Sequence, residues 1–265
     1  MSEPVNLKFC NASRDGHLFI VTINRPDVMN ALHRPANLEL EQVFDQFARD
    51  PDLWVAIITG AGEKAFSAGN DLKYLASGHD NTVPQSGFGG LTARFDLDKP
   101  VIAAVNGFAF GGGFELALSC DIVVADERAT FALPEPRVGL AATAGGLLRL
   151  PRKIHLKQAM GMILTGRRAT AEEGLRLGFV NEVAPAGESL AVAKRWANEI
   201  LECSPAAIRA AKHLATRSAW GEGFPEEYAA QKKHAALRAM YQGADYIEGP
   251  KAFSEKRRPV WTSSI

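Results

Sequence analysis

Apolar and polar positions are arranged along this chain in blocks that predict strands and helices in alternation. Short apolar runs bounded by turn residues are typical of buried strands, and apolar residues three and four apart are typical of helices. We therefore expect a helix over residues 38–47, and strands at residues 18–23, 54–59, 101–105, 122–125 and 179–183. The Thr-Ala-Glu-Glu sequence at 170–173 is a candidate capping box, with Gly178 ending the helix that follows. This order of elements predicts an α/β fold.

The pattern changes after about residue 186, where helical periodicity replaces the alternation. Helices are expected at 190–201, 206–217 and 226–241, with a shorter helical piece over 245–258. The chain is therefore expected to consist of an α/β core over residues 1–186 and a helical C-terminal region over residues 187–265.

Composition narrows the class of protein. The 265 residues include 30 basic and 30 acidic side chains, so charge indicates neither a nucleic acid nor an anionic membrane as a partner. Three widely spaced cysteines, Cys10, Cys120 and Cys203, suggest neither a disulfide framework nor a metal site. The N-terminus carries no signal-peptide pattern, and no apolar run resembles a membrane span. We expect a soluble, cytoplasmic protein with one large core.

Residues 107–115, Gly-Phe-Ala-Phe-Gly-Gly-Gly-Phe-Glu, are the first candidate for chemistry. They connect a buried strand to a segment that favours helix from Glu115 onward. Backbone N–H groups at a helix start are unpaired, so this turn could stabilise an oxyanion with Glu115 as a nearby acid or base. A dinucleotide fingerprint is excluded because Leu116 stands where a glycine is required, and no Walker tripeptide follows. Close helix–strand packing, with Glu115 in solvent, is the alternative.

Two further segments fit the same chemistry. Residues 65–73 also place small residues between an apolar strand and a helix start, so the N–H of Asn70 could be a second oxyanion donor and Asp71 a helix cap. Glu135 lies between Pro134 and Pro136 in an apolar stretch, which would hold it stiffly. Burial would raise the pKa of that carboxyl and suit it to general acid catalysis. The alternative for residues 65–73 is an ordinary loop, and the alternative for Glu135 is a surface turn with the carboxylate in solvent.

Taken together, these motifs resemble the crotonase (enoyl-CoA hydratase/isomerase) superfamily over nearly the whole chain. The matching segments are Asn-Arg-Pro at 24–26, Asn-Ala-Leu at 30–32, and residues 65–73, 99–121, 131–135, 145–146, 164–166 and 252–257. Within the family, the sequence is most similar to the carnitinyl-CoA dehydratases.

The resemblance implies a spiral core of repeated ββα units and a C-terminal trimerisation region, assembled as a homotrimer or a dimer of trimers. It implies a coenzyme A thioester as substrate, whose carbonyl oxygen would bind the N–H groups of Asn70 and Gly112. Glu115 and Glu135 would be the two catalytic carboxylates. The residues expected to contact coenzyme A are Ala31 and Lys73 and, from a neighbouring subunit, Phe253 and Lys256.

The expected reaction is the addition or removal of water across the 2,3-bond of the acyl group. We assign the water to Glu115 and the proton at C2 to Glu135, although the two roles could be shared or reversed. We expect no metal and no cofactor besides the coenzyme A of the substrate. An isomerase, a thioester hydrolase and an inactive binding or assembly protein are the alternatives. Ala142-Thr143 replaces a proline-glycine pair common in hydratases, and Asn70 replaces the usual alanine. The first departure leaves the identity of the acyl group open, and the polar Asn70 makes a polar acyl group conceivable.

Overall fold

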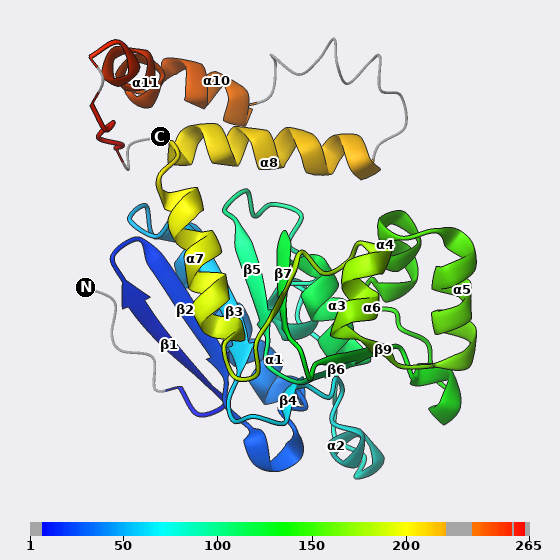
Figure 1. Ribbon diagram of the computed structural model, residues 1–265. Coiled ribbons are helices and arrows are strands. Elements are labelled where there is room, and N and C mark those ends of the chain that lie inside the picture. Colours follow the sequence, from blue (N-terminus) through cyan, green and yellow to red (C-terminus); the bar gives the residue numbers. More distant parts are fainter. Residues whose placement is uncertain (1–6, 221–234, 256, 263–265) are drawn as a thin grey trace.

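A six-stranded sheet forms the centre of the molecule (Figure 1). The computed structural model describes residues 7–220, 235–255 and 257–262. The sheet order is β1-β2-β3-β5-β7-β10; β1 and β2 are antiparallel, and all later neighbours are parallel. The strands are β1 (Cys10–Asp15), β2 (Leu18–Ile23), β3 (Val55–Gly60), β5 (Val101–Val105), β7 (Ile122–Asp126) and β10 (Glu182–Ala184).

A second, smaller sheet is formed by short strands, three of which come directly after strands β3, β5 and β7 of the large sheet. Its order is β4-β6-β8-β9, with parallel pairing up to β8 and antiparallel pairing between β8 and β9. The strands are β4 (Ala65–Ser67), β6 (Phe108–Phe110), β8 (Thr130–Ala132) and β9 (Ala169–Thr170). Because the chain passes from one sheet to the other and then into a helix, ββα units repeat, as the resemblance to the crotonase superfamily implies.

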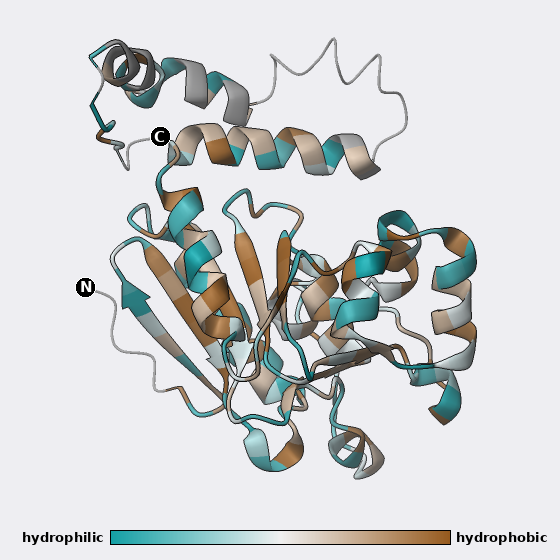
Figure 2. Ribbon diagram, viewed as in Figure 1, coloured by the Kyte–Doolittle hydropathy of each residue, from teal (hydrophilic) through white to brown (hydrophobic). Residues whose placement is uncertain are grey.

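Helices cover both faces of the large sheet. On one face α1 (Arg34–Arg49) contributes Leu40, Phe44 and Phe47 to the main apolar core. On the other face α7 (Ser189–Leu201) packs Ala193 and Ala197 against a second apolar cluster on the sheet. Figure 1 shows α7 lying over the sheet, roughly along the direction of β2, and Figure 2 shows the apolar character of the strands beneath it. The remaining helices are α2 (Leu72–Ala76), α3 (Gly112–Ser119), α4 (Gly146–Lys153), α5 (Leu156–Thr165), α6 (Ala171–Leu177), α8 (Pro205–Trp220), α10 (Ala235–Gln242) and α11 (Asp245–Ser254), with 3₁₀ turns η1 (Pro26–Val28), η2 (Phe88–Gly90) and η3 (Glu135–Val138).

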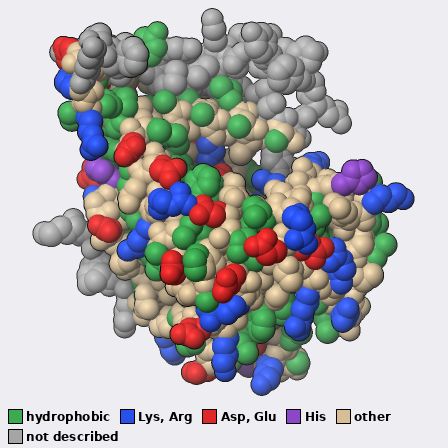
Figure 3. Space-filling model, viewed as in Figure 1, with side chains coloured by type: hydrophobic (Ala, Val, Ile, Leu, Met, Phe, Trp, Pro, Cys, Tyr) green, Lys and Arg blue, Asp and Glu red, His purple; other side chains and the backbone are tan. Residues whose placement is uncertain are grey.

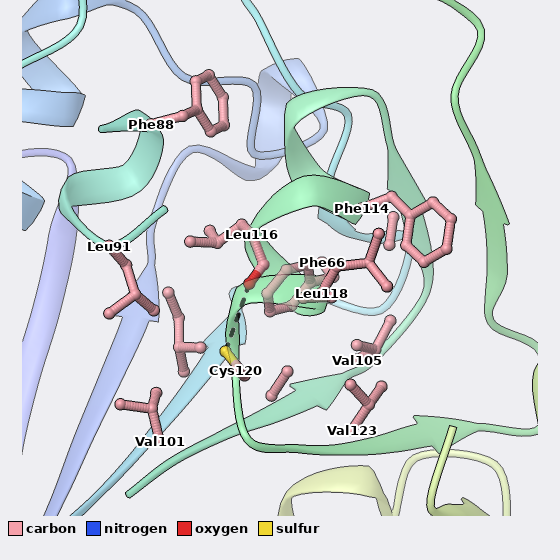
Figure 4. Packing of buried hydrophobic residues seen from close by; sticks show 14 of the residues in the cluster. Phe66, Phe88, Leu91, Val101, Val105, Phe114, Leu116, Leu118, Cys120 and Val123 are labelled. Atoms are coloured by element: carbon pink, nitrogen blue, oxygen red, sulfur yellow. Dashed lines mark hydrogen bonds between the residues drawn. The ribbon is translucent and has the colours of Figure 1, made fainter. Parts of the chain in front are cut away.

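The core beneath the glycine-rich turn is packed with aromatic and branched side chains (Figure 4). The rings of Phe114, Phe131 and Phe179 lie 5.1–5.2 Å apart, centroid to centroid. Leu116 and Cys120 are also buried, and the Cys120 thiol donates a 3.4 Å hydrogen bond to the Leu116 carbonyl. This close packing holds α3 in place, so the backbone at its N-terminus has little freedom to move.

The α/β pattern is confirmed, with one strand placed wrongly. The predicted strand at 179–183 is shifted, because β10 runs over Glu182–Ala184. Phe179 and Val180 are apolar because they pack against Gly174 and the aromatic core after α6, so their hydrophobicity reflects core burial instead of sheet pairing. The helix expected from Glu115 starts earlier, at Gly112. Of the predicted capping box, the Thr170 hydroxyl accepts from the N–H of Glu173 at 3.1 Å.

The C-terminal helices α8, α10 and α11 extend away from the core (Figure 1). Lys212 of α8 is joined to the core by 2.8 Å hydrogen bonds to the Asp121 carboxylate and the Lys99 carbonyl. A cavity of about 700 Å³ remains between α8 and the core, and Phe95 on its rim is 80% exposed. The division of the chain at residues 186 and 187 stays a prediction, as does trimerisation.

The surface carries charges of both signs side by side on the face shown in Figure 3, in keeping with the balanced composition. Among the described helices, none has the length and apolar character needed to span a bilayer. The three cysteines are unpaired; Cys10 and Cys120 are buried and Cys203 is exposed.

Candidate active site

Glycine is required in the glycine-rich turn, because the backbone angle at one position and the close neighbours at two others leave no room for a side chain. Gly111 has a φ of 54°, which favours glycine, and its N–H donates to the Ala132 carbonyl at 2.9 Å. A Cβ at Gly113 would lie 2.1 Å from the carbonyl oxygen of Ser67, and one at Gly112 would lie 2.7 Å from the Phe88 ring. Side chains at these positions would force the turn away from its neighbours. The glycines therefore hold the start of α3 close to β4 and to the segment around Phe88.

Two backbone N–H groups meet beside this turn. A Cβ at Gly69 would lie only 2.8 Å from the backbone nitrogen of Gly112, so the two predicted donor loops are in contact. The flanking N–H groups are paired: that of Gly69 donates to Ser67 Oγ at 3.2 Å and that of Asp71 to the Leu32 carbonyl at 3.0 Å. Within the described residues, the N–H groups of Asn70 and Gly112 have no protein acceptor. They are free to bind an oxygen of a ligand.

The loop that carries Asn70 is held by a buried asparagine. Asn30 has a φ of 55° and is fully buried. Its side-chain oxygen accepts from the N–H of Arg25 at 2.9 Å, and its side-chain nitrogen donates to the Ala65 carbonyl at 2.7 Å. Ser67 Oγ then donates to the Asn30 carbonyl at 2.8 Å. These bonds join the Asn-Ala-Leu segment to β4 and so fix the path toward Asn70.

The same arrangement brings Ala31 and Lys73 to one edge of the donor loops. The N–H of Leu32, next to Ala31, donates to the Gly69 carbonyl at 2.8 Å. Asp71 caps α2 by accepting from the N–H of Tyr74 at 3.1 Å, which places the exposed Lys73 in the first turn. Two of the residues expected to contact coenzyme A thus lie near the two N–H groups predicted to be oxyanion donors.

Glu115 lies one turn into α3 and is 3% exposed. Its Oε1 accepts a 2.8 Å hydrogen bond from the N–H of Gly146, the first residue of α4. Burial, together with the nearby charge of Glu135, raises the pKa of Glu115 to about 7 in spite of this hydrogen bond. The alternative of a solvent-exposed Glu115 is therefore wrong. At neutral pH this carboxyl can both take up and release a proton.

Glu135 approaches the same turn from β8. It begins η3, directly after Pro134, and a Cβ at Gly111 would lie 2.9 Å from its Oε1. Burial raises the pKa of Glu135, and its Oε2 is buried without a partner in the described structure. A buried, unpaired carboxyl oxygen favours the protonated form. The alternative of a fully solvated Glu135 carboxyl is therefore wrong, although residues 136–141 of the turn are exposed.

The structure thus brings together Asn70, Gly112, Glu115 and Glu135, which the sequence indicated one by one. The role assigned to each stays a prediction. Phe253 belongs to α11, but its side chain is outside the described structure, as is the whole of Lys256. The described residues contain no group of three or more His, Cys, Asp or Glu side chains arranged to hold a metal ion. The contact of Phe88 with Gly112 and the hydrogen bond from Gly146 to Glu115 had no signal in the sequence, because each joins segments that are distant along the chain.

Comparison with known proteins identifies the family to which the chain belongs. A family model described as enoyl-CoA hydratase/isomerase matches residues 14–264. The carnitinyl-CoA dehydratase of Salmonella typhi is 44% identical over 266 residues, spanning 98% of this chain and 99% of that protein. The crystal structure of enoyl-CoA hydratase from Mycobacterium tuberculosis H37Rv is 40% identical, with a TM-score of 0.91 over 96% of this chain and 99% of that chain. A carnitinyl-CoA hydratase structure from Mycobacterium avium is 38% identical, with a TM-score of 0.76 over 97% and 100% of the two chains.

Proposed function

Because the chain belongs to the enoyl-CoA hydratase/isomerase family, we propose that it is a hydro-lyase that adds water to, or removes it from, the 2,3-bond of an acyl-CoA thioester. One observation carries the proposal. Two carboxyl groups with raised pKa values, Glu115 and Glu135, lie beside two backbone N–H groups that have no protein acceptor in the described structure. An isomerase needs one proton-transferring group, whereas adding water requires a proton acceptor and a proton donor.

The N–H groups of Asn70 and Gly112 would bind the thioester oxygen. When water attacks C3 of a conjugated enoyl thioester, negative charge develops on that oxygen as an enolate. Donors held in place before the reaction stabilise this charge, by roughly 3–4 kcal/mol per donor in comparable acyl-transfer sites. The glycine turn and the buried Asn30 keep the two donors fixed throughout the reaction.

The two carboxyl groups would then move the protons. Glu115 takes a proton from the water as its oxygen bonds to C3, and Glu135 delivers a proton to C2 as the enolate collapses. In the dehydration direction the same groups act in reverse. The hydrogen bond from Gly146 to Glu115 Oε1 orients the carboxylate toward the water. Because only water and protons are exchanged, the reaction requires neither a metal nor a redox cofactor.

A polar acyl group of the carnitinyl type is our proposed substrate class. It is supported by similarity to a protein named carnitinyl-CoA dehydratase and by the polar residue at position 70. The side-chain oxygen of Asn70 accepts a hydrogen bond from the side-chain amide of Asn81, so the donor loop carries a polar pair. Coenzyme A would lie along Ala31 and Lys73.

We also propose that the protein is a homotrimer or a dimer of trimers, located in the cytoplasm. The cavity beneath α8 and the exposed Phe95 leave apolar surface that another subunit could cover. Such a subunit could also bring Phe253 and Lys256 to the coenzyme A. Sedimentation equilibrium would test the assembly, with masses of three or six times 28.6 kDa expected and a monomer contradicting it. Cell fractionation would test the location.

The function is tested by assaying purified protein on crotonyl-CoA, longer enoyl-CoAs and carnitinyl-CoA. We expect loss or gain of the 2,3-double bond, followed by its ultraviolet absorbance, without added cofactor and undiminished by EDTA. Turnover of the carnitinyl thioester above that of crotonyl-CoA would support the polar acyl group. Absence of hydration or dehydration on every thioester would contradict the hydro-lyase proposal.

A further inference from the structure

The aromatic ring of Phe88 packs against the proposed oxyanion donor. A Cβ built on Gly112 would lie 2.7 Å from both Cε1 and Cζ of this ring, so the ring edge contacts the backbone of Gly112. The neighbouring Gly111 is approached in the same way by Glu135 Oε1, at 2.9 Å. Two consecutive residues of this turn therefore have different neighbours: Gly112 contacts the Phe88 ring, and Gly111 contacts the carboxyl of Glu135, the candidate catalytic acid. A thioester carbonyl bound to the Gly112 N–H would lie beside both.

Phe88 is held rigidly in this position. Its own N–H donates to Thr92 Oγ1 at 2.8 Å, and the N–H of Gly89 donates to Asn37 Oδ1 of α1 at 2.7 Å. Arg149 of α4 donates to the Thr92 carbonyl at 2.7 Å. Phe88 is 5% exposed, so its ring lies inside the molecule and not in solvent. The segment is thus fastened both to α1 and to the helix that begins at Gly146.

The fixed Phe88 ring restricts the size of the acyl chain on a thioester whose carbonyl binds at Gly112. The acyl chain leaves the carbonyl carbon within a few ångströms of the oxygen bound at Gly112, so its first carbons must pass close to the ring. Apolar pockets discriminate by size, and one methylene changes the rate of a reaction by about 10-fold or more. A smaller side chain at position 88 would open space at this point.

We propose that Phe88 is a specificity-determining residue that limits the size of the acyl group. This inference rests on the proposed function, since it assumes that an acyl-CoA binds at Gly112. It assigns to Phe88 a role in selecting the substrate, and none in transferring protons.

The test compares butyryl-CoA and octanoyl-CoA binding by calorimetry, together with kcat/KM for crotonyl-CoA and trans-2-octenoyl-CoA. For Phe88→Ala we expect the preference for the eight-carbon over the four-carbon thioester to rise about 10-fold or more. Phe88→Leu should give a smaller shift in the same direction. Leu91→Ala is the matched control, because Leu91 lies in the same segment and is also 5% exposed, and in Figure 4 its side chain points away from Phe88. It should lower the melting temperature without changing the preference.

An unchanged preference in both Phe88 variants, or an equal shift in Leu91→Ala, would overturn the inference. If Phe88→Ala does not fold, the Phe88→Leu measurement decides. Binding needs no turnover, so the two proposals can fail separately. If wild-type protein binds the thioesters but shows no hydration, the hydro-lyase proposal fails and the size selection is still measured. If no thioester binds, both fail.

Discussion

The guanidinium of Arg25 lies 3.1 Å from the carboxylate of Asp71, and both side chains are largely buried. The same nitrogen of Arg25 also donates to the carbonyl of Ala31. Asp71 directly follows Asn70 and caps α2, so one cation holds together the Ala31 loop, the proposed donor Asn70 and the helix that carries Lys73. In the sequence, Asn-Arg-Pro at 24–26 carried part of the family resemblance, but nothing in it indicated this contact with Asp71.

Removing this cation should therefore affect both stability and turnover. For Arg25→Ala we expect a loss of about 3 kcal/mol in the free energy of unfolding, because Asp71 would be left as an unpaired, buried charge. Turnover should fall as Asn70 loosens, and Arg25→Lys should restore part of both. Urea unfolding and kcat measurements check this. Arg195→Ala is the control, since Arg195 is about half exposed and its ion pairs with Glu182 and Glu199 lie at the surface, where such pairs contribute little to stability.

Neutralising either candidate catalytic carboxyl should abolish most of the turnover. Glu115→Gln and Glu135→Gln keep the size of the side chain but remove proton transfer, which typically contributes about 10²–10⁴ to the rate. Coenzyme A binding should persist in both variants. Glu172→Gln, at an exposed position, should leave kcat unchanged. Wild-type kcat in either of the first two variants would refute the paired-carboxylate mechanism.

The pH profile should reflect the raised pKa of Glu115. The base must be ionised to accept a proton from water, so kcat/KM should decline as pH falls below about 7. Glu135 must be protonated to act as the acid, and its raised pKa extends that form toward neutral pH, with a second decline on the alkaline side. Initial rates between pH 5 and pH 9 would show this bell shape. A flat profile from pH 5 to pH 7 would be inconsistent with Glu115 as the base.

Glu115→Gln should also stabilise the protein at alkaline pH. The folded pKa of about 7 exceeds the ordinary value of 4.5, so the folded state retains a proton that the unfolded state loses between these pH values. Wild-type stability therefore falls across this window as pH rises, whereas glutamine does not titrate. The variant should gain roughly 3 kcal/mol over wild type at pH 8, and much less at pH 4.5. Urea unfolding at both pH values measures the difference; a pH-independent difference would argue against a burial cost.

A methyl group at the glycine turn should damage catalysis, while one elsewhere should not. Gly113→Ala would place a Cβ 2.1 Å from the Ser67 carbonyl and so displace the start of α3, lowering kcat at least 10-fold through loss of donor geometry. Gly161→Ala in α5 meets no atom within 4 Å and should stabilise the helix by about 1 kcal/mol. Thermal unfolding and kcat for both variants provide the comparison. Equal kcat in the two would remove the geometric argument.

Long buried strands could be read from the sequence, whereas short ones could not. Val101–Val105 was predicted with its observed ends, because every residue of β5 is buried and turn residues bound the run. The strands β4, β6 and β8 have three residues each, too few to establish a period. Phe179 shows the opposite error, since its burial against Phe114 resembles a strand signal. The pattern of apolar residues indicates that a segment is buried, but it does not show whether the segment pairs in a sheet or packs against other side chains.

Those parts of the candidate site that are marked by neighbouring residues in one loop could be predicted from the sequence. Glycine triplets and a proline-framed glutamate are local signals, so Gly112 and Glu135 could be identified from their immediate neighbours. Contacts between distant segments could not be identified in this way. Gly146 is 31 residues from Glu115, and their hydrogen bond exists only because α4 folds back over α3. The position of the Phe88 ring on Gly112 depends likewise on tertiary packing.

The order of strands in the large sheet, β1-β2-β3-β5-β7-β10, follows the order of synthesis. Each new strand therefore pairs with one that has already left the ribosome, and the sheet can grow at a single edge during translation. Glu115, Glu135 and Gly146 have all been synthesised before β10 and α7. The two candidate catalytic carboxyl groups can thus come together on the nascent chain, before the C-terminal helices have been synthesised.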